Sequence, residues 1–466
     1  MFSRKLFQDI FEPSALIGHF PEHVQSVVTD SRADVKDSLF VALRGEHFDG
    51  HQFVEACFAN GAALAMVEAD AQIQLDEACH GLIRVDDTLL GLQDLARQYL
   101  QTLPGLRIGL TGSNGKTTTK ELLAATLGYS AGTEHVLATK GNLNNHIGLP
   151  LTALTASADH KYLVLEMGMN HAGEISLLCD IARPQIALIT NVGMAHAGNF
   201  DGIDAVGRAK GEIFAGLASD GIAVVNLDDE RCVRAAEHLE PAQQITFGEH
   251  AASDVRINQV RVLGPMKLQL EVTYQNQTLL VELPCIGHHN AHNATGAIAV
   301  AVAAGVPFEQ AVHGLTHTTW ARGRLQFHET ESGAWLIDDT YNANPDSMLA
   351  GLRTLNELGQ QKRMVLIVGD MLELGDEAKK EHYQIGRAAV ESGVGKIYAC
   401  GHFSSDYKAG AIDSGLSAND FWECETSLEM AAFAAEQIKN GDVVLIKGSR
   451  GARMERVVER LMSWAE

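Results

Sequence analysis

Short, continuous apolar runs alternate with stretches of helical periodicity along most of the chain. In the middle of the sequence these runs cover residues 107–111, 162–166, 186–190 and 222–226. Continuous apolar strands that are separated by helices are typical of parallel sheets covered on both faces. We therefore predict an α/β protein that is built on parallel sheets.

The same pattern divides the chain into three α/β segments. Residues 1–83 form a small unit, residues 84–318 a longer one with an antiparallel insert near 267–283, and residues 319–466 a third. A length of 466 residues also suggests about three domains, with limits good to about ten residues. Further strands are expected at 38–43, 63–67, 82–85, 335–338, 363–368, 396–399 and 442–447.

Composition and charge narrow the possible partners. Hydrophobic residues make up 46% and charged residues 20%, which is ordinary for a globular protein. No run approaches the roughly 18 apolar residues of a membrane helix, and the N-terminus lacks the apolar core of a secretory signal. The net charge of −23 disfavours nucleic acid and anionic membranes. Any phosphate site must therefore gather basic groups locally.

The cysteines indicate a reducing compartment. The chain has seven, which are scattered and never form a Cys-x-x-Cys pair. This usage is typical of free thiols in a cytosol, and not of a disulfide framework or a zinc site. We expect a cytoplasmic monomer that binds neither nucleic acid nor membranes.

A glycine-rich segment carries the clearest chemical signal. Residues 111–117 (Thr-Gly-Ser-Asn-Gly-Lys-Thr) follow an apolar strand and precede a helical run at 121–127. Backbone N–H groups in such a turn converge on phosphate oxygens, and the helix N-terminus adds positive charge. Lys116 would reach the outer phosphates, and the Thr117 hydroxyl would bind Mg²⁺. The general P-loop pattern places a glycine where Leu110 stands, so a tight turn with a chance Lys-Thr is the alternative.

Together with the next threonine, this segment resembles the nucleotide loop of the Mur ligases and folylpolyglutamate synthetases, which share the variant spacing. The resemblance to the Mur ligase family extends over nearly the whole chain. It implies a UDP-substrate-binding domain at 1–83, a P-loop ATP-binding domain at 84–318 and a Rossmann-like α/β domain at 319–466 that closes over the amine substrate. It also implies ATP and two Mg²⁺ as cofactors. The implied nucleotide-contacting residues are Gly112, Ser113, Asn114, Gly115, Lys116, Thr117 and Thr118.

Three further residues are candidates for magnesium binding. Glu166 ends an apolar run, at the place where open α/β sheets bind ligands, although a lone glutamate there is more often a solvated cap. His196 also follows a strand and fits a loop histidine equally well. Lys210 lies in an expected helix at 204–212 and alone reads as a surface lysine. The resemblance implies that Glu166 and His196 bind magnesium and that Lys210 is carbamylated, which makes it a metal-binding anion.

A histidine-rich run lies farther along the chain. Residues 287–294 read Gly-His-His-Asn-Ala-His-Asn-Ala, and this spacing is not that of a zinc motif. No metal is therefore expected from the run. Asn290 and Asn293 share one helical face. The resemblance implies that Asn293 reads adenine and that Asn290 orients the site.

Arg324 lies in an Arg-Gly-Arg segment between the second and third domains. Read alone, this segment is equally consistent with a solvated linker. The resemblance implies that Arg324 contacts the outer phosphate, a role that suits a permanently charged, bidentate guanidinium. With Lys116 and carbamylated Lys210, it completes the expected catalytic set.

The third domain carries the segment that distinguishes subtypes of the family. Residues 337–348 (Ile-Asp-Asp-Thr-Tyr-Asn-Ala-Asn-Pro-Asp-Ser-Met) resemble the members that add D-alanyl-D-alanine. The Tyr-Ala-His and Asn-Pro-Arg segments of the members that add the third residue are absent. Asp338 and Asp339 are neighbours on a strand, so only one can face the site. The resemblance implies that Asp339 contacts the ATP ribose. Residues implied to line the substrate cleft are Tyr341, Asn342, Asn344, Ser449 and Arg450.

Two polar segments, at 29–32 and 139–145, read alone as turns. The resemblance places the first near the uridine diphosphate and the second against the muramoyl peptide. The implied substrates are UDP-N-acetylmuramoyl-tripeptide and D-alanyl-D-alanine, which are joined through an acyl phosphate. The implied substrate-contacting residues here are Ser31, Arg32, Arg44, Asn142, Asn144 and Asn145.

Other classes explain less of the sequence. A folylpolyglutamate synthetase shares the loop but lacks the domain that carries residues 30–32. A P-loop switch or motor hydrolyses nucleotide without an amine acceptor, and the guanine-reading Asn-Lys-x-Asp is absent. A sensor of UDP-sugars would not need Glu166, His196 and Arg324 together. The sequence therefore favours an ATP-dependent ligase.

Overall fold

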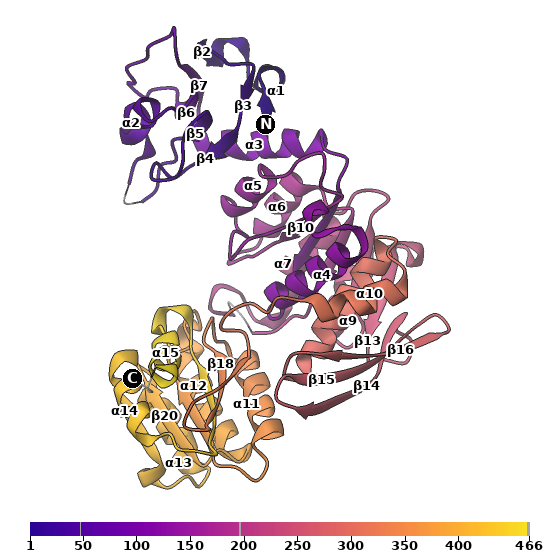
Figure 1. Cartoon of the computed structure of the whole chain (residues 1–466), viewed down its shortest axis with the longest axis vertical. Coiled ribbons are helices and arrows are strands. Elements are labelled where there is room, and N and C mark those ends of the chain that lie inside the picture. The colour runs from indigo at the N-terminus through magenta and orange to yellow at the C-terminus, as the bar shows by residue number, and fades with distance from the viewer. Residues whose placement is uncertain (47, 195–196, 464–466) are drawn as a thin grey trace.

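The computed structural model describes residues 1–46, 48–194 and 197–463. Three α/β units follow one another along the long axis of the molecule, with the N-terminal unit at one end and the C-terminal unit at the other (Figure 1). Their main sheets take strands from residues 16–85, 106–283 and 326–447. The predicted α/β fold class is confirmed. The expected limit after residue 83 falls inside strand β7 (Gly81–Val85), and the limit after residue 318 falls between two sheets.

The N-terminal unit has a five-stranded sheet in the order β2-β7-β6-β5-β4, parallel except for the β2–β7 pair. Alternate residues of β6 point to opposite faces. Leu64 and Met66 join the cluster that includes α3, whereas Ala65 and Val67 join the cluster that includes α2. The elements are β1 (Phe2–Ser3), α1 (Arg4–Ile10), β2 (Leu16–Gly18), β3 (His23–Val24), β4 (Ser26–Val28), β5 (Ser38–Val41), α2 (Val54–Ala59), β6 (Leu64–Glu68), β7 (Gly81–Val85) and α3 (Thr88–Gln101).

Helix α3 joins the first two units. It begins at a cap in which the Asp87 side chain accepts hydrogen bonds from the Leu89 and Leu90 amides, at 2.7 and 2.9 Å. The helix packs both on β6 and on helices α5 and α6 of the middle unit. A single buried hydrophobic cluster therefore continues from the first sheet into the second.

The middle unit has a nine-stranded sheet in the order β16-β15-β14-β13-β12-β11-β8-β10-β9. Strands β8 to β14 pair in parallel, and β14, β15 and β16 pair antiparallel. The predicted antiparallel segment is thus confirmed, and it extends the main sheet. Its strands are β8 (Leu106–Thr111), β9 (Val136–Ala138), β10 (Tyr162–Glu166), β11 (Ile186–Ile189), β12 (Ile222–Asn226), β13 (Gln244–Gly248), β14 (Val255–Gly264), β15 (Lys267–Tyr274) and β16 (Gln277–Leu283).

Helices cover both faces of this sheet, as the continuous apolar strands predict. On β10, Val164 belongs to the cluster that includes α4, α9 and α10, while Leu163 and Leu165 belong to the cluster that includes α6 and α7. The helices are α4 (Lys116–Ala131), α5 (Gly148–Ala153), α6 (Glu174–Ala182), α7 (Ile203–Ala215), α8 (Glu230–Ala236), α9 (His289–Ala303) and α10 (Phe308–Gly314).

The C-terminal unit has a six-stranded sheet in the order β17-β18-β22-β19-β20-β21, parallel except for the edge strand β17. One face packs on α11, α12 and α13, and the other on α14 and α15. Within the described residues, no helix is long and apolar enough to cross a membrane. The elements are β17 (Gln326–Glu329), β18 (Trp335–Asp339), α11 (Pro345–Gly359), β19 (Met364–Val368), α12 (Ala378–Glu391), β20 (Lys396–Cys400), α13 (Ser404–Asp413), β21 (Phe421–Cys424), α14 (Ser427–Gln437), β22 (Val443–Lys447) and α15 (Glu455–Met462).

Candidate active site

The glycine-rich loop connects the central strand β8 to helix α4. Gly115 caps the helix with φ of +80°, a left-handed conformation that favours glycine. A Cβ atom at Gly115 would also collide with the side chain of Asn293. The Lys116 Nζ donates a hydrogen bond to the Gly112 carbonyl at 2.6 Å, so the lysine lies back over its own loop. The sequence-predicted strand, turn and helix are all present.

The segment after β11 holds the loop in shape. The Ser113 Oγ accepts a hydrogen bond from the Gly193 amide at 2.8 Å. The Asn114 amide donates to the Asn191 Oδ1 at 3.0 Å, and the Asn114 carbonyl accepts from the Thr190 hydroxyl at 2.6 Å. These bonds order the loop before any phosphate arrives, which lowers the entropic cost of binding.

Glu166 ends β10 beside the loop and has one unsatisfied oxygen. Its Oε1 accepts a hydrogen bond from Asn144 Nδ2 at 2.8 Å and lies 3.5 Å from the Thr117 Oγ1. Its Oε2 is buried and has no hydrogen-bond partner among the described residues; the nearest cation is the Lys120 Nζ at 4.0 Å. Carboxylate and hydroxyl oxygens are ligands that Mg²⁺ prefers, and an orphaned buried carboxylate oxygen calls for a partner. Thr117 and Glu166 therefore fit the magnesium role that the family resemblance implies.

Two lysines of this region, Lys116 and Lys210, have lowered pKa values. Burial lowers the pKa of Lys116; nearby Glu166 opposes that shift, and Arg324 adds to it. Lys210, on α7, is only 1% exposed, and burial together with the charge of Lys116 lowers its pKa well below the ordinary value. Lys210 is therefore a buried residue and not a surface lysine. The predicted ligand His196 lies outside the described residues.

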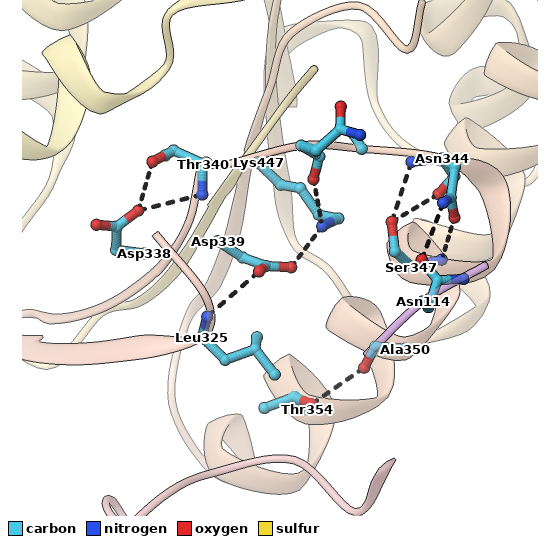
Figure 2. Close-up of polar contacts among 12 residues, drawn as sticks. Asn114, Leu325, Asp338, Asp339, Thr340, Asn344, Ser347, Ala350, Thr354 and Lys447 are labelled. Carbon is cyan, nitrogen blue, oxygen red and sulfur yellow. Dashed lines mark hydrogen bonds and ion pairs between the residues drawn. The ribbon is translucent and has the colours of Figure 1, made fainter. Parts of the chain in front are cut away.

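The C-terminal unit contributes a buried ion pair (Figure 2). The Asp339 Oδ2 accepts a hydrogen bond from the Lys447 Nζ, and its Oδ1 accepts one from the Leu325 amide at 3.2 Å. Lys447 also donates to the Asn342 carbonyl at 2.9 Å, and burial lowers the pKa of its ammonium group. Asp338 points elsewhere and accepts two hydrogen bonds from Thr340. The prediction that only one of the two aspartates faces the site is consistent with this arrangement.

Two side chains at the start of α11, one from its N-cap and one from its first turn, contact the middle unit across the domain boundary. They reach the nucleotide loop and the segment after β11. The Asn344 Nδ2 donates to the Asn114 Oδ1 at 2.9 Å, while its Oδ1 caps α11 by accepting from the Ser347 amide (Figure 2). The Asp346 Oδ2 accepts from the Met194 amide at 2.7 Å. The C-terminal unit is thus hydrogen-bonded directly to the segments that shape the phosphate loop.

Arg324 bridges the same two units. Its guanidinium group lies 4.0 Å from the centre of the Tyr341 ring, which is the geometry of a cation–π contact. Its Nη2 lies 3.5 Å from the Thr117 Oγ1, and its Nε is buried and has no hydrogen-bond partner among the described residues. Tyr341 therefore holds Arg324 beside the phosphate loop, where a residue that contacts phosphate must lie.

A cavity of about 910 Å³ lies between the middle and C-terminal units. Asn290 and Asn293 line it from the first turns of α9, where Asn293 Nδ2 donates to Asn290 Oδ1 at 2.9 Å. The cavity also collects most of the predicted nucleotide and amine-site residues, namely Ser113, Asn114, Gly115, Lys116, Thr118, Arg324, Asp339, Asn342, Asn344, Ser449 and Arg450.

Several predicted substrate residues already have other partners. The Ser449 Oγ accepts from the Leu372 amide at 2.8 Å and donates to the Ala343 carbonyl at 3.2 Å, so it joins two loops. The Arg450 side chain is exposed and lies 3.6 Å from Glu455. The Asn145 Oδ1 accepts from the Ile147 and Gly148 amides at the start of α5.

The predicted uridine-diphosphate residues lie in the N-terminal unit and do not line the cavity. Arg32, beside Ser31 in a turn, is exposed and pairs with Asp30. Arg44 pairs with Glu68 at 2.6 Å. Asn142, which was predicted to contact the muramoyl peptide, is exposed on the loop before α5 of the middle unit. The roles of these residues in substrate binding stay predictions.

Three residues of the site were not singled out from the sequence. They are Lys120, Asp346 and Lys447. Lys447 stands at the end of an apolar strand, which is a usable signal, but its partner Asp339 is distant in the chain. Asp346 reads as an ordinary acidic residue in the first turn of a helix.

Comparison with known proteins identifies the class. The "Mur ligase middle domain" family matches residues 110–301, the "Mur ligase, glutamate ligase domain" family matches 323–450, and the "Mur ligase family, catalytic domain" matches 23–100. The chain therefore belongs to the Mur ligase family, as predicted, and is an ATP-dependent ligase.

Within that family, the curated relatives that are more than 30% identical include members of the D-alanyl-D-alanine-adding subtype. The UDP-N-acetylmuramoyl-tripeptide–D-alanyl-D-alanine ligases of Bacillus subtilis and Escherichia coli are 35% and 36% identical to this chain, over 95% and 94% of both sequences. A crystal structure of MurF from Acinetobacter baumannii is 35% identical, covers 99% of this chain and 98% of its own, and has a TM-score of 0.87. MurF from Thermotoga maritima, in complex with ADP, is 28% identical over 95% of this chain and 98% of its own, with a TM-score of 0.81.

One member of the rival class has the same fold at much lower sequence identity. A folylpolyglutamate synthase from Mycobacterium tuberculosis, solved with ADP and AMPPCP, is 17% identical, covers 80% of this chain and 94% of its own, and has a TM-score of 0.60.

Proposed function

We propose that this protein uses ATP to join the carboxylate of UDP-N-acetylmuramoyl-tripeptide to the amino group of D-alanyl-D-alanine, which gives the pentapeptide precursor of peptidoglycan. The observation that carries the proposal is the cavity in which Lys116 of the phosphate loop meets Arg324, Asp339 and Asn344 of the C-terminal unit. The full-length relatives carry this activity in their names. The seven free cysteines suit a cytoplasmic reaction.

The reaction proceeds in two steps. A carboxylate oxygen of the tripeptide attacks the γ-phosphorus of ATP, and the bond to the bridging oxygen breaks, so that an acyl phosphate forms and ADP leaves. The free amine of D-alanyl-D-alanine then attacks the acyl carbon, loses a proton and expels phosphate. Activation is needed because oxide is too poor a leaving group for direct amide formation. No side-chain nucleophile takes part.

The residues of the cavity supply charge and alignment. Lys116 and Arg324 offset the repulsion between the substrate carboxylate and the phosphates, and stabilise charge that develops during transfer. The loop amides around Gly115 bind phosphate oxygens at the start of α4. Asn293 lies against the loop and contacts the adenine, and Asp339, held by Lys447, faces the ribose. Closure of the C-terminal unit onto the middle unit would exclude water from the space between them and protect the acyl phosphate from hydrolysis.

Thr117 and Glu166 would hold Mg²⁺, with the predicted His196 and a carbamylated Lys210 as further ligands. The unpartnered Glu166 Oε2 supports this assignment. Bound Mg²⁺ neutralises phosphate charge and aligns the transferred group.

Carbamylation of Lys210 rests on its state in the structure. Burial and the charge of Lys116 lower the pKa of Lys210, which favours the unprotonated amine that reacts with CO₂ to form a carbamate and a proton. We expect Lys210→Ala to lower ligase activity by about 10²–10³-fold, the effect of removing a key electrostatic group. Added short-chain carboxylates should restore part of that activity by entering the space that the side chain leaves. An active Lys210→Ala enzyme, indifferent to CO₂ and to carboxylates, would contradict the assignment.

The substrate assignment is tested by ADP release. With UDP-N-acetylmuramoyl-tripeptide and ATP present, we expect D-alanyl-D-alanine to accelerate ADP formation, and diaminopimelate, lysine and glutamate to leave it at the background rate. Mass spectrometry of the product should show the tripeptide extended by two alanines. Acceleration by a single diamino acid would assign another subtype of the family. Phosphate release that is independent of any amine would instead indicate a nucleotide hydrolase.

A further inference from the structure

Two histidines and a glutamate meet at the rim of the nucleotide cavity, outside the residues assigned above. His288 and His292 are four residues apart at the start of α9, so their side chains lie on one face of the helix. Glu249 comes from the segment between β13 and β14. One ligand atom from each of the three lies within 4.8 Å of those of the other two. The Glu249 Oε1 is 4.0 Å from the His288 Nε2 and 3.8 Å from the His292 Nε2.

A fourth residue positions this cluster. The Asp228 Oδ2 lies 3.1 Å from the His292 Nε2, and its carboxylate accepts hydrogen bonds from the Glu249 and His250 amides at 2.6 and 2.9 Å. Asp228 therefore fixes both a ring of the cluster and the backbone that presents Glu249. The Nε2 atom of His292 that lies beside Asp228 is also the atom that faces Glu249, so a metal bound at this nitrogen would take the place of its hydrogen bond to Asp228.

We propose that His288, His292 and Glu249 form a binding site for a divalent transition metal of the zinc class. Two imidazoles and a carboxylate are donors that Zn²⁺ accepts, whereas Mg²⁺ prefers oxygen ligands alone. Bonds of about 2.0–2.1 Å in a tetrahedral site place ligand atoms about 3.4 Å apart. The two separations from Glu249, 3.8 and 4.0 Å, exceed this value by about half an ångström, and the ligand atoms of the two histidines lie within 4.8 Å of each other. The side chains of Glu249 and His288 are exposed and can rotate to close these gaps.

The site is placed where its occupancy affects the nucleotide cavity. Asp228 and His292 line the cavity wall, and the first turns of α9 carry Asn290 and Asn293. A metal held by both segments ties the start of α9 to the β13–β14 connection. The histidine run alone does not predict the site, because the third ligand comes from a different part of the chain.

Equilibrium dialysis of the untagged full-length protein against Zn²⁺, with excess Mg²⁺ to fill the phosphate site, tests the proposal. We expect one Zn²⁺ per chain at this site. His288→Ala and His292→Ala should each weaken binding by at least about tenfold, which is within the range that follows loss of even an outer partner of a metal site. Glu249→Gln, which keeps the shape of the side chain, should weaken binding as well.

The matched control is His250→Ala. His250 is exposed, adjoins Glu249 and lies outside the cluster of three ligands, so Zn²⁺ binding should be unchanged. The wild-type protein would overturn the proposal by binding no Zn²⁺. Retention of wild-type affinity in His288→Ala/His292→Ala, or an equal loss in His250→Ala, would also overturn it. Circular dichroism of each variant shows that the fold is retained, and because His288 and Glu249 are exposed, their substitutions leave the core unchanged.

Discussion

Lys116→Ala is expected to lower the rate of ATP-dependent ligation by about 10²–10³-fold, which corresponds to about 2.7–4 kcal/mol of lost transition-state stabilisation. In the proposed mechanism the charge of Lys116 reaches the phosphates, and Glu166 and Arg324 both lie close enough to its ammonium group to influence its pKa. The effect should appear mainly in kcat, because the charge that the lysine offsets grows during phosphoryl transfer. Steady-state ADP release with all three substrates present measures it.

Lys161→Ala is the matched control for this variant. Lys161 is exposed, precedes β10 in the same domain and lies far in sequence from the loop, so its loss should leave kcat unchanged. Equal unfolding midpoints for the two variants would show that the Lys116 effect is on chemistry. Near-normal turnover by Lys116→Ala would refute its role at the phosphates.

Lys447→Met is expected to destabilise the C-terminal domain by about 3–5 kcal/mol. Its ammonium group is 2% exposed and pairs with Asp339, which keeps only the Leu325 amide as a partner when the charge is removed. Methionine matches lysine closely in length, so the lost stability comes mainly from the unpaired Asp339 carboxylate and less from a cavity. Three of the four tryptophans stand at residue 335 or later, and Trp320 packs against the core of the middle unit, so intrinsic fluorescence during urea unfolding reports mainly on this domain.

The double variant Lys447→Met/Asp339→Asn separates charge from packing. Asparagine removes the uncompensated charge, so the double variant should recover a large part of the stability that the single variant loses. Lys379→Met, at an exposed position of α12, should leave the unfolding transition in place. If Lys447→Met unfolds at the wild-type urea concentration, the ion pair contributes nothing to the domain.

Sequence periodicity predicted the buried parallel strands well. The expected strands at 162–166 and 222–226 match β10 and β12 from end to end, and the antiparallel insert expected near 267–283 contains β15 and β16. Strands β9, β13 and β14 were not singled out. Strand β9 spans only three residues, and polar residues interrupt β13 and β14. Much of β14 is also exposed. A strand that is buried on one face lacks the continuous apolar run that reveals a central strand.

The site was predictable where its residues follow apolar strands. The phosphate loop follows β8, and Glu166 ends β10. These two strands are neighbours in the sheet, so their carboxyl ends meet. Predicting that Asp339 pairs with Lys447 requires knowing that β18 and β22, the strands that end at these residues, are neighbours in the sheet although they are far apart in the sequence. Strand order depends on which helices cross over the sheet, and a single sequence does not reveal it. Ser449, predicted as a substrate contact, lines the cavity and also joins two loops, because its hydroxyl reaches both backbones; its role in substrate binding stays a prediction.

The hydrogen bonds from Asn344 and Asp346 to the loop region have a thermodynamic consequence. Because these bonds hold the same segments that shape the phosphate loop, ATP binding and domain contact must strengthen each other by an equal free energy. A small molecule that displaces Asp346 from the Met194 amide would therefore weaken ATP binding while leaving the phosphate groove open. An inhibitor of this enzyme need not resemble any of its substrates.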